Sequence, residues 1–150
     1  MNDQHKFFKL LKYSNELKKN KKSLRKEDPE AFDMLLHFSV TIEENLNYSE
    51  KQEYIELAKD FLADQITADD FSYSFMAIYE GINRKLGQMK RTESLELANF
   101  LKPSRPELGD LLARIYGSCD SYSPDPEIAM SDKKELKDCA QILLFKLQEE

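Results

Sequence analysis

The stretch YIELAKDFLADQITADDFSYSFMAIYEGINRKL, residues 54–86, decides the fold of this chain. Apolar residues recur in it at steps of three and four, first from Tyr54 to Leu62 and again from Phe71 to Leu86. Such spacing places the apolar side chains on one side of a helix. The stretch therefore predicts two consecutive helices, which form a helical hairpin.

The connection between these helices carries a helix-start signal. Thr67 is followed three residues later by Asp70, the spacing of a capping box, in which each side chain accepts a hydrogen bond from the other residue's backbone N–H. Ile66 and Phe71 stand at the two positions of a hydrophobic staple, which fixes the angle at which the chain enters the helix. The second helix is therefore predicted to begin at about residue 68.

Helix caps and breaks predict further helices on both sides of the hairpin. Asp28 is expected to cap a helix that begins at Pro29, with His37 at its surface, and Gly87 is expected to end the second hairpin helix. The Lys-rich tract Lys18–Lys26 is interpreted as an exposed linker or a frayed helix end. The remaining expected caps are boxes at Ser49 with Gln52 and at Ser104 with Glu107, and Ser131 at the start of the last helix.

The whole chain is predicted to be all-α, because it has only four Gly and five Pro and no run of alternating β-branched residues. Residues 1–48 are interpreted as an N-terminal helical extension that is basic at its start. Residues 49–150 are predicted to form an antiparallel helical bundle with a four-helix core. The four central helices are expected at about residues 50–64, 68–86, 106–118 and 132–148, and a shorter helix at 92–101.

Charge is unevenly distributed. Residues 1–27 carry nine Lys and Arg and three Asp and Glu, a net charge of +6, which leaves −12 for residues 28–150. An acidic body repels nucleic acid and anionic membranes and favours a basic protein partner, although solubility alone also explains an acidic surface. The basic start is interpreted as docking onto the acidic body; binding to a membrane or to phosphates is the alternative.

Catalytic and cofactor signatures are absent from the sequence. It contains no Gly-rich phosphate loop, no GxSxG, no HExxH and no CxxC, and neither His5 nor His37 follows a Glu by three residues. Neither an enzyme, nor a cofactor, nor a metal is therefore expected. Cys119 and Cys139 are predicted to be buried thiols, and with no signal peptide or membrane span a cytoplasmic location is expected.

The loop after residue 119 combines carboxylates with a Tyr and the two prolines Pro124 and Pro126, a rigid surface suited to a basic protein. The alternative is a loop that only joins two helices, with Tyr122 covering the end of the bundle. The residues expected to contact a partner are Asp120, Tyr122, Asp125 and Glu127 in this loop and, as a second choice at the hairpin, Asp69 and Asp70.

Three segments resemble the bacterial self-protective colicin-like immunity family, of the colicin D immunity type. They are AKDFLADQITADDFSYSF (58–75), IYGSCDSYSPDPEIAMS (115–131) and ELKDCAQILLFKL (135–147). The resemblance implies a small antiparallel helical bundle that binds a tRNA-cleaving toxin domain and blocks its basic active-site cleft with acidic residues. It assigns no individual toxin contacts. The alternative is a helical interaction module with a different partner and no toxin-related role.

Overall fold

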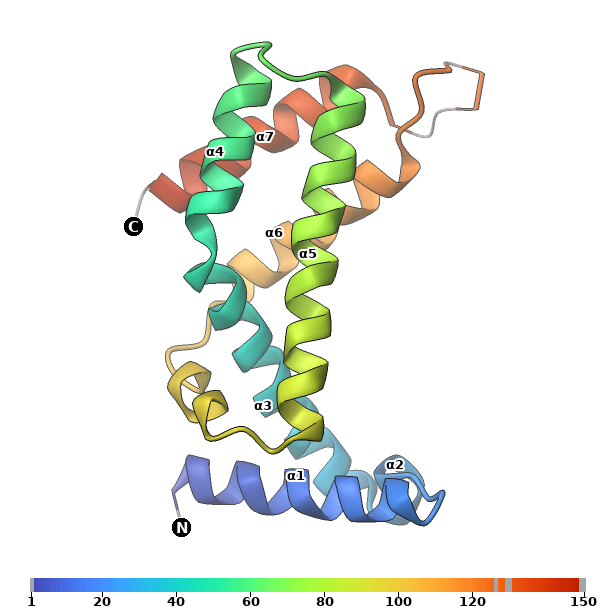
Figure 1. Ribbon diagram of the computed structural model, residues 1–150, viewed down its shortest axis with the longest axis vertical. Helices are drawn as coiled ribbons and strands as arrows, with labels where there is room; N and C mark the ends of the chain where they lie inside the picture. The colour runs from blue at the N-terminus through green and yellow to red at the C-terminus, as the bar shows by residue number, and fades with distance from the viewer. Residues whose placement is uncertain (1, 126, 129–130, 149–150) are drawn as a thin grey trace. The chain divides into compact units, whose positions relative to one another are not determined.

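The structure is a computed structural model that describes residues 2–125, 127–128 and 131–148 (Figure 1). Its helices are α1 (Asp3–Lys19), α2 (Leu24–Glu27), α3 (Pro29–Ser49), α4 (Lys51–Leu62), α5 (Ala68–Arg91), the 3-10 helix η1 (Leu95–Phe100), α6 (Pro106–Ser121) and α7 (Lys133–Gln148). No β-strand occurs among the described residues, which confirms the predicted all-α class.

The chain folds into two compact units, each made of two chain segments. Unit 1 comprises Met1–Leu46 and Asn83–Arg105, and unit 2 comprises Asn47–Ile82 and Pro106–Glu150. Helices α3 and α5 each contribute residues to both units. The units do not coincide with the sequence segments 1–48 and 49–150, because residues 83–105 group with the N-terminal part of the chain.

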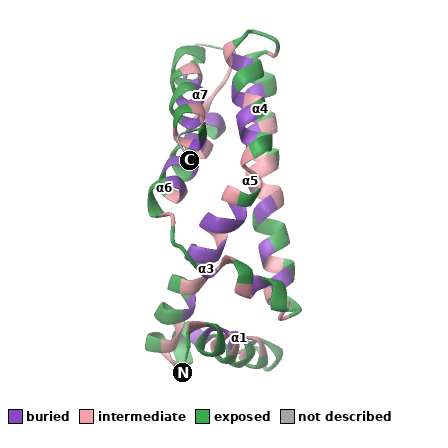
Figure 2. Cartoon of the chain, turned by 90° about the vertical axis from the view of Figure 1, so that its left-hand side faces the viewer, coloured by how far each residue is buried: buried purple, intermediate pink, exposed green. Residues whose placement is uncertain are grey.

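Unit 2 contains the predicted four helices: α4, the first part of α5, α6 and α7. Helix α7 packs against both α4 and α6. Apolar residues recur in α6 at steps of three and four, which predicts one buried side, and the residues of this stripe are all buried: Leu108, Leu111, Leu112, Ile115 and Cys119. Figure 2 shows stripes of buried residues on α4 and α7, with exposed residues on their other sides. The four-helix core is thus confirmed.

The start of α5 is held as the sequence predicts. The backbone N–H of Asp70 donates to Thr67 Oγ1 at 3.1 Å, and the N–H of Thr67 donates to Asp70 Oδ2 at 3.2 Å. Phe71 is completely buried and its ring stacks on that of Phe61, with 4.5 Å between the centroids. The capping box and this aromatic pair together fix where α5 begins.

Three features of unit 1 differ from the prediction. The Lys-rich tract is not entirely a linker, because Leu24 is buried and begins the single-turn helix α2, with Ser23 Oγ accepting from the N–H of Lys26. Leu36 follows Leu35 in the apolar stripe of α3, where helical spacing predicts burial, but it is 49 % exposed. Leu95 would face inward in an α-helix over 92–101, but it is 80 % exposed and Leu97 is buried instead, because residues 95–100 form a 3-10 helix with three residues per turn.

Gly87 does not end α5, and the prediction there is wrong. The helix continues to Arg91, and Glu93 adopts the left-handed conformation with φ 52°. The N–H of Glu93 then donates to the carbonyl of Lys90, and that of Ser94 to the carbonyl of Met89. This is the helix-ending turn that glycine usually forms, here made by a glutamate.

The predicted box at Ser49 is also wrong. Ser49 is the last residue of α3, and α4 begins after Glu50 without a side-chain cap. The sequence Asn47-Tyr48-Ser49 predicts a break in the chain, but Asn47 is buried within α3, and its Oδ1 accepts from the hydroxyl of Tyr54 at 2.6 Å. This tertiary hydrogen bond satisfies a polar side chain that would otherwise favour a turn.

The caps expected at Ser131 and Ser104 are replaced by other contacts. Ser131 is buried and its hydroxyl donates to the carbonyl of Ser118, whereas Asp132 caps α7 by accepting from the N–H of Glu135. The hydroxyl of Ser104 donates to Glu44. Both serines therefore hold segments distant in sequence together, and neither begins a helix.

Replacement of Glu44 by Ala should lower the free energy of unfolding by about 1–3 kcal/mol. Glu44 is buried, and its Oε1 accepts from the Ser104 hydroxyl at 3.0 Å and from the N–H of Arg105 at 2.9 Å. Without the carboxylate both donors lose their acceptor. Chemical denaturation measures the effect; Asp33→Ala at an exposed site of α3 is the control, and an equal loss in both variants would contradict the assignment.

Cys119 and Cys139 are both buried free thiols, as predicted. Burial raises the pKa of the Cys119 thiol to about 12, with a smaller effect from Cys139. Since the thiolate is the reactive form, neither thiol should react with an aromatic disulfide reagent at pH 8 until the chain unfolds. Ala113→Cys at an exposed site of α6 should react at the rate of a free thiol, and equally fast reaction of the wild type would refute the burial.

Candidate partner-binding surface

The first turn of α5, the last turn of α6 and the loop that follows α6 lie at one end of unit 2 (Figure 1). The charges of these segments act on one another. Burial raises the pKa of Tyr122, and the nearby carboxylate of Asp69 raises it further. The structure therefore brings residues from both groups of predicted contact residues to the same end of the unit.

Asp120 was expected in the loop but lies in the last turn of α6, because this helix continues to Ser121. Its side chain is exposed. Tyr122 follows the helix and is half-buried, and its backbone forms an isolated bridge with Ser131. Tyr122 is thus anchored at the end of the bundle, while Asp120 faces solvent.

Asp125 and Glu127 are both exposed. The N–H of Asp125 donates to Ser123 Oγ at 3.2 Å, and the N–H of Glu127 donates to Asp125 Oδ1 at 3.0 Å. These local bonds hold the turn that presents the two carboxylates. Pro126, expected to stiffen the turn, lies outside the described residues.

Asp69 and Asp70 are exposed in the first turn of α5, where negative charge also favours the helix dipole. Asp70 is engaged in the capping box. Asp69 forms no part of that box. Of the two, Asp69 is the better candidate for contact with a partner.

Three further residues of this surface were missed by the sequence analysis. Tyr73, one turn after Asp69, is 77 % exposed. The hydroxyl of Tyr116 donates to Glu80 Oε1 at 2.6 Å. The signal that could have found the two tyrosines is the spacing of four residues, which places Asp69 with Tyr73 on α5 and Tyr116 with Asp120 on α6. No sequence signal marks Glu80.

The tyrosine at position 116 holds Glu80 in place. Its ring lies 5.1 Å from that of Tyr79, between ring centroids. The hydrogen bond to Glu80 is the main cause that raises the pKa of the Tyr116 hydroxyl, followed by burial and by the charges of Glu80 and Asp120. The hydroxyl therefore stays protonated and keeps donating to the carboxylate.

We call the resulting region the acidic surface. It consists of Asp69, Tyr73 and Glu80 of α5, Tyr116 and Asp120 of α6, and Tyr122, Asp125 and Glu127 of the following loop. Of its three tyrosines, Tyr73 is exposed and the other two are half-buried. Carboxylates together with an exposed aromatic ring are suited to Lys and Arg side chains, which pair with carboxylates and stack on aromatic rings. Among the described residues, no group of three or more His, Cys, Asp and Glu is placed to hold a metal ion.

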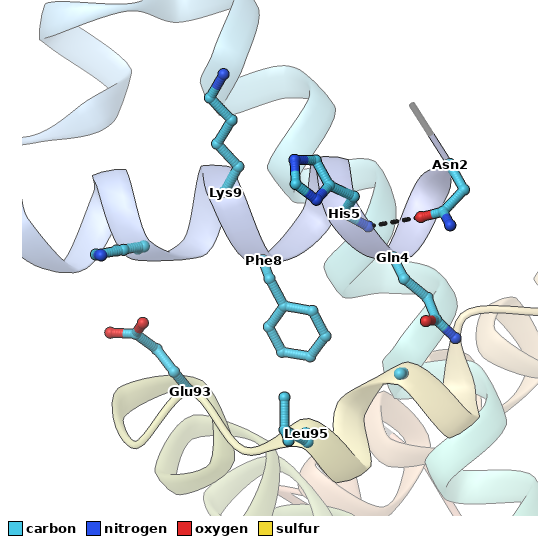
Figure 3. Close-up of a pocket in the computed structure, with 9 residues that line it drawn as sticks. Asn2, Gln4, His5, Phe8, Lys9, Glu93 and Leu95 are labelled. Atoms are coloured by element: carbon cyan, nitrogen blue, oxygen red, sulfur yellow. Dashed lines mark hydrogen bonds between the residues drawn. The ribbon is translucent and has the colours of Figure 1, made fainter.

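Unit 1 carries a separate open groove of about 770 Å³ between α1 and η1. Figure 3 shows Phe8 of α1 pointing toward Leu95 across the groove, with His5 and Lys9 on the same helix. The groove could not be predicted from the sequence, because an α-helix over 92–101 would bury Leu95. Its apolar lining residues are Phe8, Leu95 and Ala98, and its charged residues are of both signs, Lys9, Lys12 and Glu93.

Comparison with known proteins returned no match: no family model, no curated protein and no solved structure is significantly similar to the chain. None of the helices in the described part of the chain is both long and apolar enough to cross a membrane.

Proposed function

We propose that this chain is a non-enzymatic inhibitor that binds and neutralises a basic protein partner through the acidic surface, as an immunity protein neutralises a tRNA-cleaving nuclease toxin. The observation that carries the proposal is Tyr73, a large aromatic side chain that is 77 % exposed. The exposed carboxylate of Asp69 stands one turn before it on α5. Asp120 on α6 is exposed as well.

The physical basis is complementarity with a nuclease cleft. An enzyme that cleaves RNA binds the phosphate backbone with Lys and Arg, so its active-site cleft is positively charged. Carboxylates on a helical scaffold can occupy the positions of phosphates, and the net charge of −12 over residues 28–150 would accelerate the encounter. Tyr73 would supply the apolar anchor that interfaces commonly place among polar contacts.

The resemblance to the colicin-like immunity family supports the same proposal. Residues 58–75 contain Asp69 and Tyr73, and residues 115–131 contain the other acidic positions of α6 and the loop. Two of the three similar segments thus supply most of the acidic surface. The resemblance and the surface are separate arguments, because the first concerns sequence and the second concerns exposure and charge.

Co-expression with the product of the adjacent reading frame tests the proposal. That product alone should arrest growth, and the wild-type chain should restore it. The double variant Tyr73→Ala with Asp120→Lys should fail to restore growth, whereas Phe145→Ala with Asp138→Lys, at exposed positions of α7, should protect. The proposal is contradicted if the product of the adjacent reading frame is not toxic, or if both double variants protect equally well. The alternative would then be an interaction module without a toxin-related role.

A further inference from the structure

A second cavity of unit 1, with a volume of about 230 Å³, gathers four cationic side chains from three helices and a turn. Lys18 comes from α1, Arg25 from α2, Lys90 from α5, and Lys22 from the turn after α1. Two largely buried hydroxyl residues, Ser14 of α1 and Ser39 of α3, also line the cavity.

The turn after α1 brings Lys22 to this cavity. Lys21 adopts the left-handed conformation with φ 58°, which is unusual for a residue other than glycine. The N–H of Lys21 donates to the carbonyl of Lys18, and that of Lys22 to the carbonyl of Leu17, so the chain folds back over the helix end. The unfavourable backbone conformation of Lys21 therefore brings Lys22 back to the end of α1, where Lys18 lies.

The cations of the cavity are poorly neutralised. In the part of the chain that the structure describes, no carboxylate lies within ion-pair distance of Lys18, Lys22, Arg25 or Lys90. Burial lowers the pKa of the Lys90 ammonium, and the charge of Lys18 lowers it further, against a weaker opposing effect of Glu43. Of the four cations only Lys90 is half-buried, whereas Lys18, Lys22 and Arg25 are exposed. A partly buried ammonium group without a counter-ion is costly, and an anion bound beside Lys90 would remove that cost.

We infer that this cavity binds a phosphate group of a small phosphorylated molecule. A phosphate carries a charge of about −1.5 to −2 and three acceptor oxygens, so it can neutralise more than one of the cations, whereas a carboxylate carries a single charge. Arg25 can form the paired hydrogen bonds that guanidinium groups make with phosphate, and its guanidinium already lies 6.0 Å from the centroid of the Phe32 ring. Ser14 and Ser39 supply hydroxyl donors.

The inference is independent of the proposed inhibitor function. All the lining residues belong to unit 1, whereas the acidic surface belongs to unit 2. The phosphate site would explain the positive charge of residues 1–27 as a ligand-binding feature, whereas docking onto the acidic body explains it only as an intramolecular contact. Loss of one activity should therefore leave the other unchanged.

Isothermal titration with sodium pyrophosphate at constant ionic strength tests the inference. The wild-type chain should bind it at one site, and Lys90→Gln should weaken binding about tenfold or more, since a charge-assisted hydrogen bond is lost. Lys18→Gln, at an exposed position where folding should be unaffected, is a second variant with the same expectation. The controls Lys85→Gln on α5 and Lys9→Gln on α1 change the net charge equally outside the cavity and should bind as the wild type does.

The inference is overturned if the wild-type chain shows no detectable binding of pyrophosphate. It is also overturned if all four variants lose affinity for pyrophosphate equally, because such a loss indicates non-specific attraction by a basic segment. A second arm uses phosphatidylcholine vesicles with and without a phosphorylated inositol lipid, which presents the same group at a membrane. If the chain binds the phosphorylated vesicles but not pyrophosphate, the inference that the ligand is a small soluble molecule is wrong. The site would then be assigned to a lipid headgroup.

Discussion

Replacement of Phe71 by Ala is expected to lower the free energy of unfolding by about 3–5 kcal/mol. Phe71 is completely buried in unit 2. Its ring stacks on that of Phe61 at 4.5 Å and lies 6.2 Å from that of Phe75, between ring centroids. Removal of the ring leaves a cavity among aromatic neighbours that the helices cannot close without moving.

The variant Thr67→Ala removes the N-cap of α5 but leaves the aromatic packing in place, so it distinguishes the two contributions to stability. Loss of an N-cap side chain typically costs about 1 kcal/mol, so this variant should be less destabilised than Phe71→Ala. Chemical denaturation of both variants gives the comparison. A larger loss for Thr67→Ala would show that α5 depends on its cap more than on the aromatic core of the hairpin.

The parts of the fold that follow from local chemistry were predictable. A capping box needs only residues three apart, and an apolar stripe needs only one helix, so the start of α5 and the buried side of α6 could be derived from the sequence. Five helix starts lie within one residue of those expected, at Pro29, Lys51, Ala68, Pro106 and Lys133.

The predictions of helix caps are wrong where a serine side chain forms a hydrogen bond with a residue distant in sequence instead of with the start of the nearby helix. Ser104 has the spacing of a capping residue, but its hydroxyl binds Glu44, sixty residues earlier in the chain. Ser131 likewise binds the carbonyl of Ser118. Nothing in the sequence near these serines indicates such partners, because the contacts exist only after the helices have packed.

The charge of the candidate site was predictable, and so was one of its aromatic residues, Tyr122, but Tyr73 and Tyr116 were not predicted. Exposed carboxylates in a loop can be read from the sequence, and Asp125 and Glu127 are exposed as expected. Tyr73 follows Phe71 by two residues, which places it on the side of α5 opposite the buried stripe, and it is 77 % exposed. The hydrogen bond between Tyr116 and Glu80 joins two helices and has no sequence signature.

Tyr73→Ala is expected to weaken binding to the basic partner about thirtyfold or more, which corresponds to about 2 kcal/mol, without loss of stability. The ring is 77 % exposed in the free chain, so its removal opens no cavity. Phe145→Ala removes a ring that is 70 % exposed on α7 and should leave the affinity unchanged. Calorimetric titration with the partner domain compares the two, and equal affinities would remove Tyr73 from the interface.

The most direct test of the acidic surface is the association rate with the basic partner as a function of ionic strength. The triple variant Asp120→Lys, Asp125→Lys, Glu127→Lys reverses the charge of three exposed acidic residues at the end of unit 2. The matched control Glu53→Lys, Glu56→Lys, Asp60→Lys makes the same change in net charge on the exposed side of α4.

Stopped-flow mixing should show that the wild-type rate falls as salt rises, because screening weakens steering between opposite charges. At low salt the triple variant should associate about tenfold or more slowly than the control, and the difference should shrink at high salt. Equal rates for the two variants at low salt, or a wild-type rate that does not depend on salt, would contradict binding through the acidic surface.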